Sequence, residues 1–175
     1  KMIYHLKISE MKSVFEISTN DIKNNWITLN KISNFTASAV IKANSYGFGM
    51  TKVAKALKDV GCNFFYVAQF EEAINLRKSL KSDAIKIGVF EGFLHDPREY
   101  KFYNLVPIIN NINQLDKFVF YNKCEDPLRG ILHLDTGMNR LGLDYIETRY
   151  VLNNIRKYDN DNFLYLMSHL TTSNK

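Results

Sequence analysis

The chain has few of the residues that build secreted mini-domains or fibrous proteins. Its two cysteines, Cys62 and Cys124, lack the spacing of metal ligands or of a redox pair, so we expect reduced, structural thiols and no metal site. With 3 prolines and 8 glycines among 175 residues, the composition also argues against collagen-like and low-complexity classes. The remaining composition, 46% hydrophobic and 23% charged, is typical of a globular protein.

Long apolar runs are missing as well. Residues 62–68 form one of the longest, and that run is far too short to cross a bilayer. No basic segment followed by an apolar one opens the chain, so no secretory signal is predicted. We therefore expect a cytoplasmic protein without a membrane partner.

Charge of one sign is not concentrated anywhere in the chain. The formal net charge is +5, from 23 Lys and Arg against 18 Asp and Glu, and the basic residues are scattered among acidic ones. Without a basic block, nucleic-acid binding is not expected. A mildly basic surface weakly favours anionic small molecules as ligands.

What the chain does contain is an alternation of short apolar runs with segments of helical period. The runs predict strands over residues 36–41, 63–67, 84–90, 105–109, 130–134 and 163–167. Helices are predicted between most of them, over residues 52–60, 71–80, 112–119 and 146–155, and a polar linker around residues 96–98. A further helix comes first, capped by Ser18 or Thr19, with Ile22, Trp26 and Leu29 as its apolar stripe.

Strands that alternate with helices at such short intervals indicate a parallel sheet built from βαβ units. We count about six units, whereas a closed (β/α)₈ barrel has eight and about 250 residues. The predicted fold class is thus α/β, an incomplete (β/α)8 TIM barrel, and we expect a fragment of a longer protein. A complete but smaller doubly wound sheet is the alternative that periodicity leaves open.

The first chemical motif follows the first predicted strand, at residues 42–49. Lys42 ends an apolar strand, where α/β proteins place their active sites, and a partly desolvated amine there can form an imine with an aldehyde. Tyr46 follows in a loop in which Gly47 and Gly49 permit sharp turns. Spacing alone favours the alternative, a surface lysine before a glycine turn.

The second motif is Leu134-Asp135-Thr136-Gly137-Met138-Asn139-Arg140-Leu141-Gly142-Leu143, again at the end of a predicted strand. Its arginine has the planar set of donors that binds a phenolate or a carboxylate. The alternative is an Asp135–Arg140 pair that merely stabilises the loop.

These two motifs resemble the alanine racemase family. Residues 39–49 read AVIKANSYGFG, similar to the pyridoxal-phosphate (PLP) lysine signature AVVKADAYGHG, with Phe48 where the family has His. Residues 135–142 read DTGMNRLG, similar to the family's DTGM[GN]RLG. Weaker similarity extends from about Val14 to the end of the chain, and the motifs stand in the family's order.

The resemblance implies roles for four residues. Lys42 is implied to be the Schiff-base lysine and one catalytic base, and Tyr46 a ligand of the PLP phosphate. Arg140 is implied to bind the cofactor and the substrate carboxylate. His169 is implied to pack against the pyridine ring, although Ser168 and Leu170 depart from the family's T-H-F-A.

His133 is a further departure. Many family members have at this position a lysine that becomes carbamylated and braces the arginine, and imidazole cannot form that carbamate. Two interpretations stay open: His133 is a hydrogen-bond partner of Arg140, or it fills the barrel interior, which we favour slightly.

The implied activity is the PLP-dependent interconversion of L-alanine and D-alanine, which supplies D-alanine for peptidoglycan. The implied assembly is a homodimer, in which a tyrosine from the partner's C-terminal β-domain is the second base. We expect residues 1–13 to be an N-terminal extension, residues 14–175 a partial PLP-binding barrel, the β-domain to be absent and the isolated piece to be inactive. A broad-specificity amino-acid racemase and a non-catalytic PLP-binding remnant are the alternatives.

Overall fold

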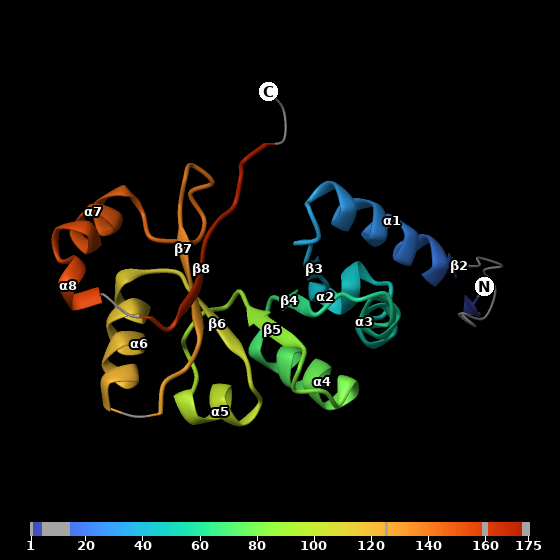
Figure 1. Cartoon of the computed structure of the whole chain (residues 1–175), viewed down its shortest axis with the longest axis horizontal. Helices are drawn as coiled ribbons and strands as arrows, with labels where there is room; N and C mark the ends of the chain where they lie inside the picture. Colours follow the sequence, from blue (N-terminus) through green and yellow to red (C-terminus); the bar gives the residue numbers. More distant parts are fainter. Residues whose placement is uncertain (1, 5–14, 125, 159–160, 173–175) are drawn as a thin grey trace, which may run out of the picture.

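The computed structural model describes residues 2–4, 15–124, 126–158 and 161–172. A parallel sheet of six strands runs through the molecule (Figure 1), and its strands are β3 (Ala39–Val40), β4 (Phe64–Val67), β5 (Lys86–Val89), β6 (Val106–Ile109), β7 (Gly130–Leu134) and β8 (Phe163–Ser168). Their order in the sheet is their order in the chain. A doubly wound sheet reverses its strand order at a switch point, so that alternative is wrong.

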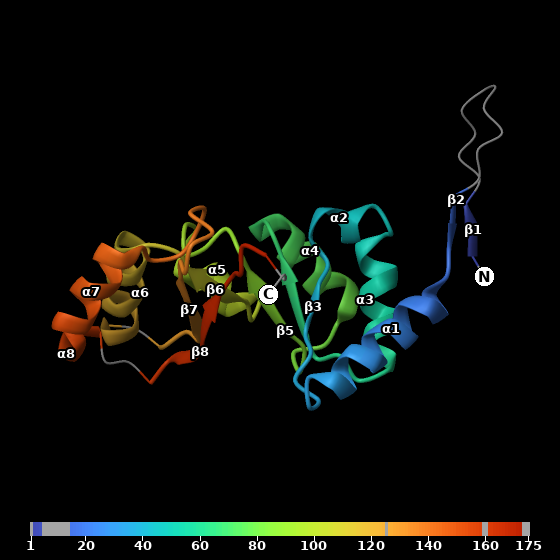
Figure 2. The same ribbon diagram turned by 90° about the horizontal axis from the view of Figure 1, so that it is seen from above.

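The described helices lie mainly along the outer face of this sheet (Figure 2). They are α1 (Thr19–Ile32), α2 (Lys42–Tyr46), α3 (Met50–Asp59), α4 (Phe70–Leu80), α5 (Pro97–Phe102), α6 (Ile112–Cys124), α7 (Tyr145–Asn153) and α8 (Ile155–Tyr158). The outer face packs with the helices into the main core, to which Phe65 and Ile87 belong. Phe64, Val106 and Ile108 form a second cluster on the inner face. In a (β/α)₈ barrel the helices cover the outer face of the sheet and strand side chains pack together on the inner face, and the same layering here confirms the incomplete barrel.

The first helix begins where it was predicted to begin, but fewer of its predicted apolar residues are buried. Ser18 is its N-cap, with a side chain that accepts a hydrogen bond from the Asp21 amide over 3.3 Å. Trp26 is buried and Ile22 is partly buried, whereas Leu29 is 60% exposed. The prediction for Leu29 was therefore wrong.

Two other segments differ from the prediction. The expected linker around residue 97 is helix α5, in which Asp96 is the N-cap, Pro97 is the first residue and the buried Tyr100 anchors the helix. An N-cap aspartate before proline is a helix start signal. The single helix expected over residues 146–155 is the pair α7 and α8, and of its three predicted apolar positions only Val151 is buried.

At the start of the chain, β1 (Met2–Tyr4) pairs antiparallel with β2 (Phe15–Ile17). Residues 5–14 lie outside the described part, so the boundary after residue 13 stays a prediction. Cys62 and Cys124 are both free, and burial raises the pKa of the Cys62 thiol to about 11. Within the described ranges, no helix has the length and apolar character needed to cross a membrane.

Candidate active site

A cavity of about 550 Å³ lies at the carboxyl ends of the strands, on the inner face of the sheet. All four residues predicted from the motifs line it, although they come from three separate segments of the chain. The polar residues that line it are Lys42, Tyr46, Tyr66, Glu91, His133, Arg140, Ser168 and His169. Its apolar wall includes Val40, Ala68, Phe90, Leu141 and Met167. Active sites of β/α barrels lie at this end of the strands.

A short left-handed helical turn follows Lys42. Its four residues, Ala43, Asn44, Ser45 and Tyr46, have φ between 51° and 57°. A left-handed turn costs L-residues about 1–2 kcal/mol each, so neighbouring groups must hold it. Within the segment, the Ser45 amide donates to the Ile41 carbonyl over 2.9 Å. After the segment, the Met50 amide donates to the Asn44 side chain over 2.9 Å.

The Lys42 amine points to the cavity wall, with its Nζ 5.8 Å from the centroid of the Phe90 ring. Tyr46 lies at the other end of the left-handed turn and is 62% exposed. The turn thus presents an amine inside the cavity and a phenol at its mouth. The sequence predicted a glycine-dependent loop here, and its glycines, Gly47 and Gly49, do adopt positive φ after the turn.

His133 lies on β7 beside the same cavity and is 5% exposed. Its Nδ1 is 2.9 Å from Oδ1 of Asn110. Because the Asn110 amide nitrogen donates to the Phe90 carbonyl over 2.7 Å, Oδ1 is the acceptor and His133 Nδ1 is the donor. The other ring nitrogen, Nε2, is buried without a hydrogen-bond partner in the described residues.

Burial is the main cause that lowers the pKa of His133, and the nearby His169 and Arg140 lower it further against the opposing effect of Asp135. A neutral ring with a proton on Nδ1 presents a lone pair at Nε2. The cavity therefore contains a fixed, buried hydrogen-bond acceptor.

The loop that carries Arg140 folds back on the end of β7. The Asp135 amide donates to the Leu143 carbonyl over 2.9 Å, and the Leu143 amide donates to the His133 carbonyl over 2.8 Å. The Asp135 carboxylate accepts from the amides of Gly137 and Asn139 over 2.9 and 3.1 Å, which lowers its pKa. Asp135 thus stabilises the loop through backbone amides, and the predicted alternative of an Asp135–Arg140 pair was wrong.

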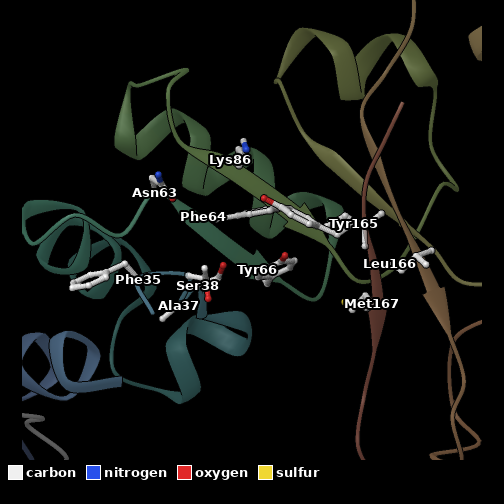
Figure 3. Close-up of a pocket in the computed structure, with 12 residues that line it drawn as sticks. Phe35, Ala37, Ser38, Asn63, Phe64, Tyr66, Lys86, Tyr165, Leu166 and Met167 are labelled. Carbon is white, nitrogen blue, oxygen red and sulfur yellow. The ribbon is translucent and has the colours of Figure 1, made fainter. Parts of the chain in front are cut away.

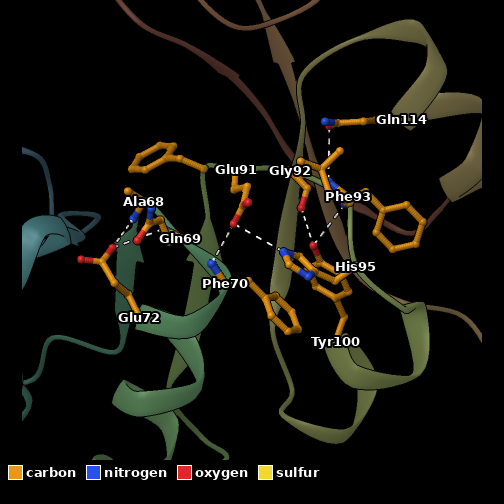
Figure 4. A network of polar contacts seen from close by, with 12 residues as sticks. Ala68, Gln69, Phe70, Glu72, Glu91, Gly92, Phe93, His95, Tyr100 and Gln114 are labelled. Carbon is orange, nitrogen blue, oxygen red and sulfur yellow. Dashed lines mark hydrogen bonds and ion pairs between the residues drawn. The ribbon is translucent and has the colours of Figure 1, made fainter.

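Motif reasoning missed Glu91, Asn110 and Glu72. Figure 4 shows Glu91 between two elements: its Oε2 accepts from the Phe70 amide over 2.9 Å and lies 3.5 Å from His95 Nε2. Asn110 directly follows β6 and is 4% exposed. A polar residue at the carboxyl end of an apolar strand was the available signal for Asn110.

A second cavity, of about 520 Å³, lies toward the amino ends of the strands (Figure 3). Phe64, Lys86 and Tyr165 line it, and Tyr66 and Met167 border both cavities. Burial, with a smaller effect of Tyr165, raises the pKa of Tyr66 to about 12. Because the motif residues line the first cavity and not this one, the first cavity is the candidate active site.

The donor set of that site fits PLP, the cofactor implied by the resemblance. An amine is available for the aldehyde, a phenol and a guanidinium for anionic oxygens, and an apolar wall for the ring. Among the described residues, none donates a hydrogen bond to the buried Nε2 of His133, so this acceptor is available in the cavity.

Comparisons with known proteins show the family to which the chain belongs. The model of the alanine racemase N-terminal domain matches residues 17–175. The chain is 42% identical to an alanine racemase of Rickettsia typhi over 161 residues, which are 90% of this chain and 40% of the relative. An alanine racemase of Rickettsia prowazekii is 40% identical over the same shares of the two chains.

Among solved structures, alanine racemase from Bartonella henselae with covalently bound pyridoxal phosphate superposes with a TM-score of 0.82 at 33% identity. The match covers 89% of this chain and 46% of that one, so the chain spans less than half the length of the relatives it matches. Sequence, strand order and the family model agree: the chain belongs to the alanine racemase family and carries the family's N-terminal domain.

Proposed function

We propose that this domain binds PLP through Lys42 and belongs to an enzyme that interconverts L-alanine and D-alanine. The observation that carries the proposal is the convergence of Lys42, Tyr46, Arg140 and His169 on one cavity at the carboxyl end of the sheet. The family and a solved relative with covalently bound pyridoxal phosphate support the choice of cofactor.

Four residues of this chain would hold the cofactor. Lys42 would bind its aldehyde carbon, Tyr46 its phosphate and His169 the face of its ring. Arg140 would bind its phenolate oxygen or the carboxylate of the substrate, because the guanidinium offers a fork of donors. When bound, PLP supplies an electron sink that acidifies the Cα proton of an amino acid.

The chain's own chemical contribution is a base on one face of Cα. The Lys42 amine would take or return the Cα proton of the substrate on its side of the cavity. Racemisation needs a second base on the opposite face. We propose that a tyrosine of a second subunit provides it, as the resemblance implies, which makes the full-length protein a homodimer.

We propose that His133 accepts a hydrogen bond from Arg140. Its Nε2 is an acceptor without a described partner, and Arg140 has only donors to offer. Both line the same cavity. These observations favour the interpretation of His133 as a partner of Arg140 over that of a filler of the barrel interior.

Borohydride reduction of the full-length protein with PLP, followed by peptide mass spectrometry and chiral analysis of several amino acids, tests the proposal. We expect the label on Lys42 and fast interconversion of alanine. Labelling elsewhere contradicts the role of Lys42, and equal rates with larger amino acids indicate a broad-specificity racemase. Labelled Lys42 without interconversion indicates a non-catalytic PLP-binding protein. If alanine is the preferred substrate, the proposed role is that of a cytoplasmic enzyme that supplies D-alanine for peptidoglycan.

A further inference from the structure

Glu72 joins the ends of two neighbouring strand–helix units. Its Oε1 accepts a hydrogen bond from the Ala43 amide over 2.7 Å. Its Oε2 accepts from the amides of Ala68 and Gln69 over 2.9 and 3.2 Å, and Figure 4 shows the carboxylate facing this pair. One carboxylate therefore ties the residue after Lys42 to the loop between β4 and α4.

The hydrogen bond to the Ala43 amide lies where the backbone changes from negative to positive φ. Lys42 follows β3, and Ala43 is the first of the four residues with positive φ. A run of non-glycine residues in this region persists only if its surroundings determine it. The Asn44 side chain, through the Met50 amide, connects the turn to α3, and Glu72 holds its entrance from α4.

We infer that Glu72 is a positioning residue that fixes the left-handed turn and thereby aims the Lys42 amine into the cavity. The inference rests on the proposed function, in which Lys42 binds PLP. Glu72 itself does not line the cavity, so it acts through the Ala43 backbone and not on a ligand.

The chain offers a control for a purely structural role. Glu72 and Gln69 form a capping box at the start of α4, in which the Gln69 side chain accepts from the backbone at Glu72. Gln69→Ala removes half of that box and leaves the Ala43 bond in place. Glu72→Gln keeps the side-chain shape, but its NH₂ group can only donate and must face amides that also donate. The amides of Ala43, Ala68 and Gln69 then compete for the one remaining oxygen, so the bond to Ala43 is weakened.

The experiment compares wild type, Glu72→Gln and Gln69→Ala in the full-length protein, with Glu72→Asp as a second variant in case Glu72→Gln does not fold. Thermal unfolding measures how much the helix cap contributes to stability. Amide hydrogen exchange of the peptide over residues 42–47 measures how firmly the left-handed turn is held. The rate of borohydride trapping of PLP on Lys42, measured across pH, shows whether the amine is positioned to react.

We expect Glu72→Gln and Glu72→Asp to exchange the 42–47 amides at least tenfold faster than wild type, and to trap PLP on Lys42 at least tenfold more slowly. Gln69→Ala should lower the melting temperature but change neither rate. Equal rates in the Glu72 and Gln69 variants would overturn the inference, because Glu72 would then be only a helix cap. Wild type that traps no PLP on Lys42 would refute the proposed function, whereas the exchange data would still decide whether Glu72 holds the turn.

Discussion

The Nδ1 of His133 donates a hydrogen bond to Oδ1 of Asn110, 2.9 Å away, and this contact fixes which ring nitrogen carries the proton. Asn110 cannot turn its amide around, because its nitrogen already donates to the Phe90 carbonyl. The Asn110 backbone amide in turn donates to the Gln114 side chain over 3.0 Å. The acceptor at His133 Nε2 is therefore held by a chain of contacts that links the residues directly after β5 and β6 with β7 and α6.

The first prediction concerns the charge of His133. Burial, with the nearby His169 and Arg140, lowers its pKa below the ordinary value of 6.5. An unfolded chain then takes up a proton near pH 6.5 that the folded chain does not, so the free energy of unfolding falls as pH drops below that value. Nitrogen NMR of labelled histidine should show a neutral ring with the proton on Nδ1 at pH 7.

The matched variant is His133→Gln, which removes the titrating ring. Urea unfolding at pH 7.5 and 5.5 should show a smaller loss of stability on acidification in this variant than in wild type. The same loss in both proteins would mean that His133 is not the group responsible.

Asn110→Leu tests the fixed tautomer from its partner's side. The substitution leaves the Nδ1 proton of His133 and the Phe90 carbonyl without their bonds. A buried polar group without a partner costs about 1–3 kcal/mol, so we expect at least that loss in the free energy of urea unfolding. Asn153→Leu, at an exposed position in α7, is the control and should change stability by less than about 0.5 kcal/mol.

Gly142 is predicted to be essential to the loop that carries Arg140. Its φ is +106°, and a Cβ there would lie 2.7 Å from the Asp135 amide nitrogen. Gly61 has a similar φ of +102° but nothing within 4 Å of such a Cβ. Both alanine variants lose about 1–2 kcal/mol to the left-handed backbone, and only Gly142→Ala adds a clash with backbone atoms. In denaturant titrations Gly142→Ala should be the less stable of the two, and equal midpoints would contradict this account.

Arg77 is predicted to be a structural anchor that lysine cannot replace. Its guanidinium donates to the carbonyls of Tyr103, Ile85 and Asn104 over 2.7–2.8 Å, and to that of Ser82. Lysine has one nitrogen, which cannot reach so many carbonyls at once. Hydrogen bonds to charged groups contribute about 1.5–3 kcal/mol each, so Arg77→Lys should lower stability by about 3 kcal/mol in a thermal melt. The exposed Arg149→Lys should have almost no effect, and a similarly small change at Arg77 would refute the anchor.

Much of the fold was predictable because hydrophobic patterning is a local property. The apolar runs that became β4 to β7 each contain buried residues, and Ser18 accepts a hydrogen bond from one of the amides that every helix start leaves unpaired. The motifs around Lys42 and Arg140 gave both residues from the sequence alone. Patterning failed at Leu29, because an apolar residue on a helix is buried only where another element covers it.

The sequence by itself thus determined where the strands of the sheet lie along the chain, the cap of the first helix and the chemical groups of the site. Only the tertiary structure decided the hand of the backbone after Lys42 and the tautomer of His133. The residues concerned do not fix either feature by themselves. Ala43 and its neighbours prefer negative φ, and the tautomer of an imidazole is set by the hydrogen bond that its ring makes. Glu72, 29 residues away from Ala43, and Asn110, 23 residues away from His133, supply the deciding hydrogen bonds, and these contacts exist only once the sheet has brought the strand ends together.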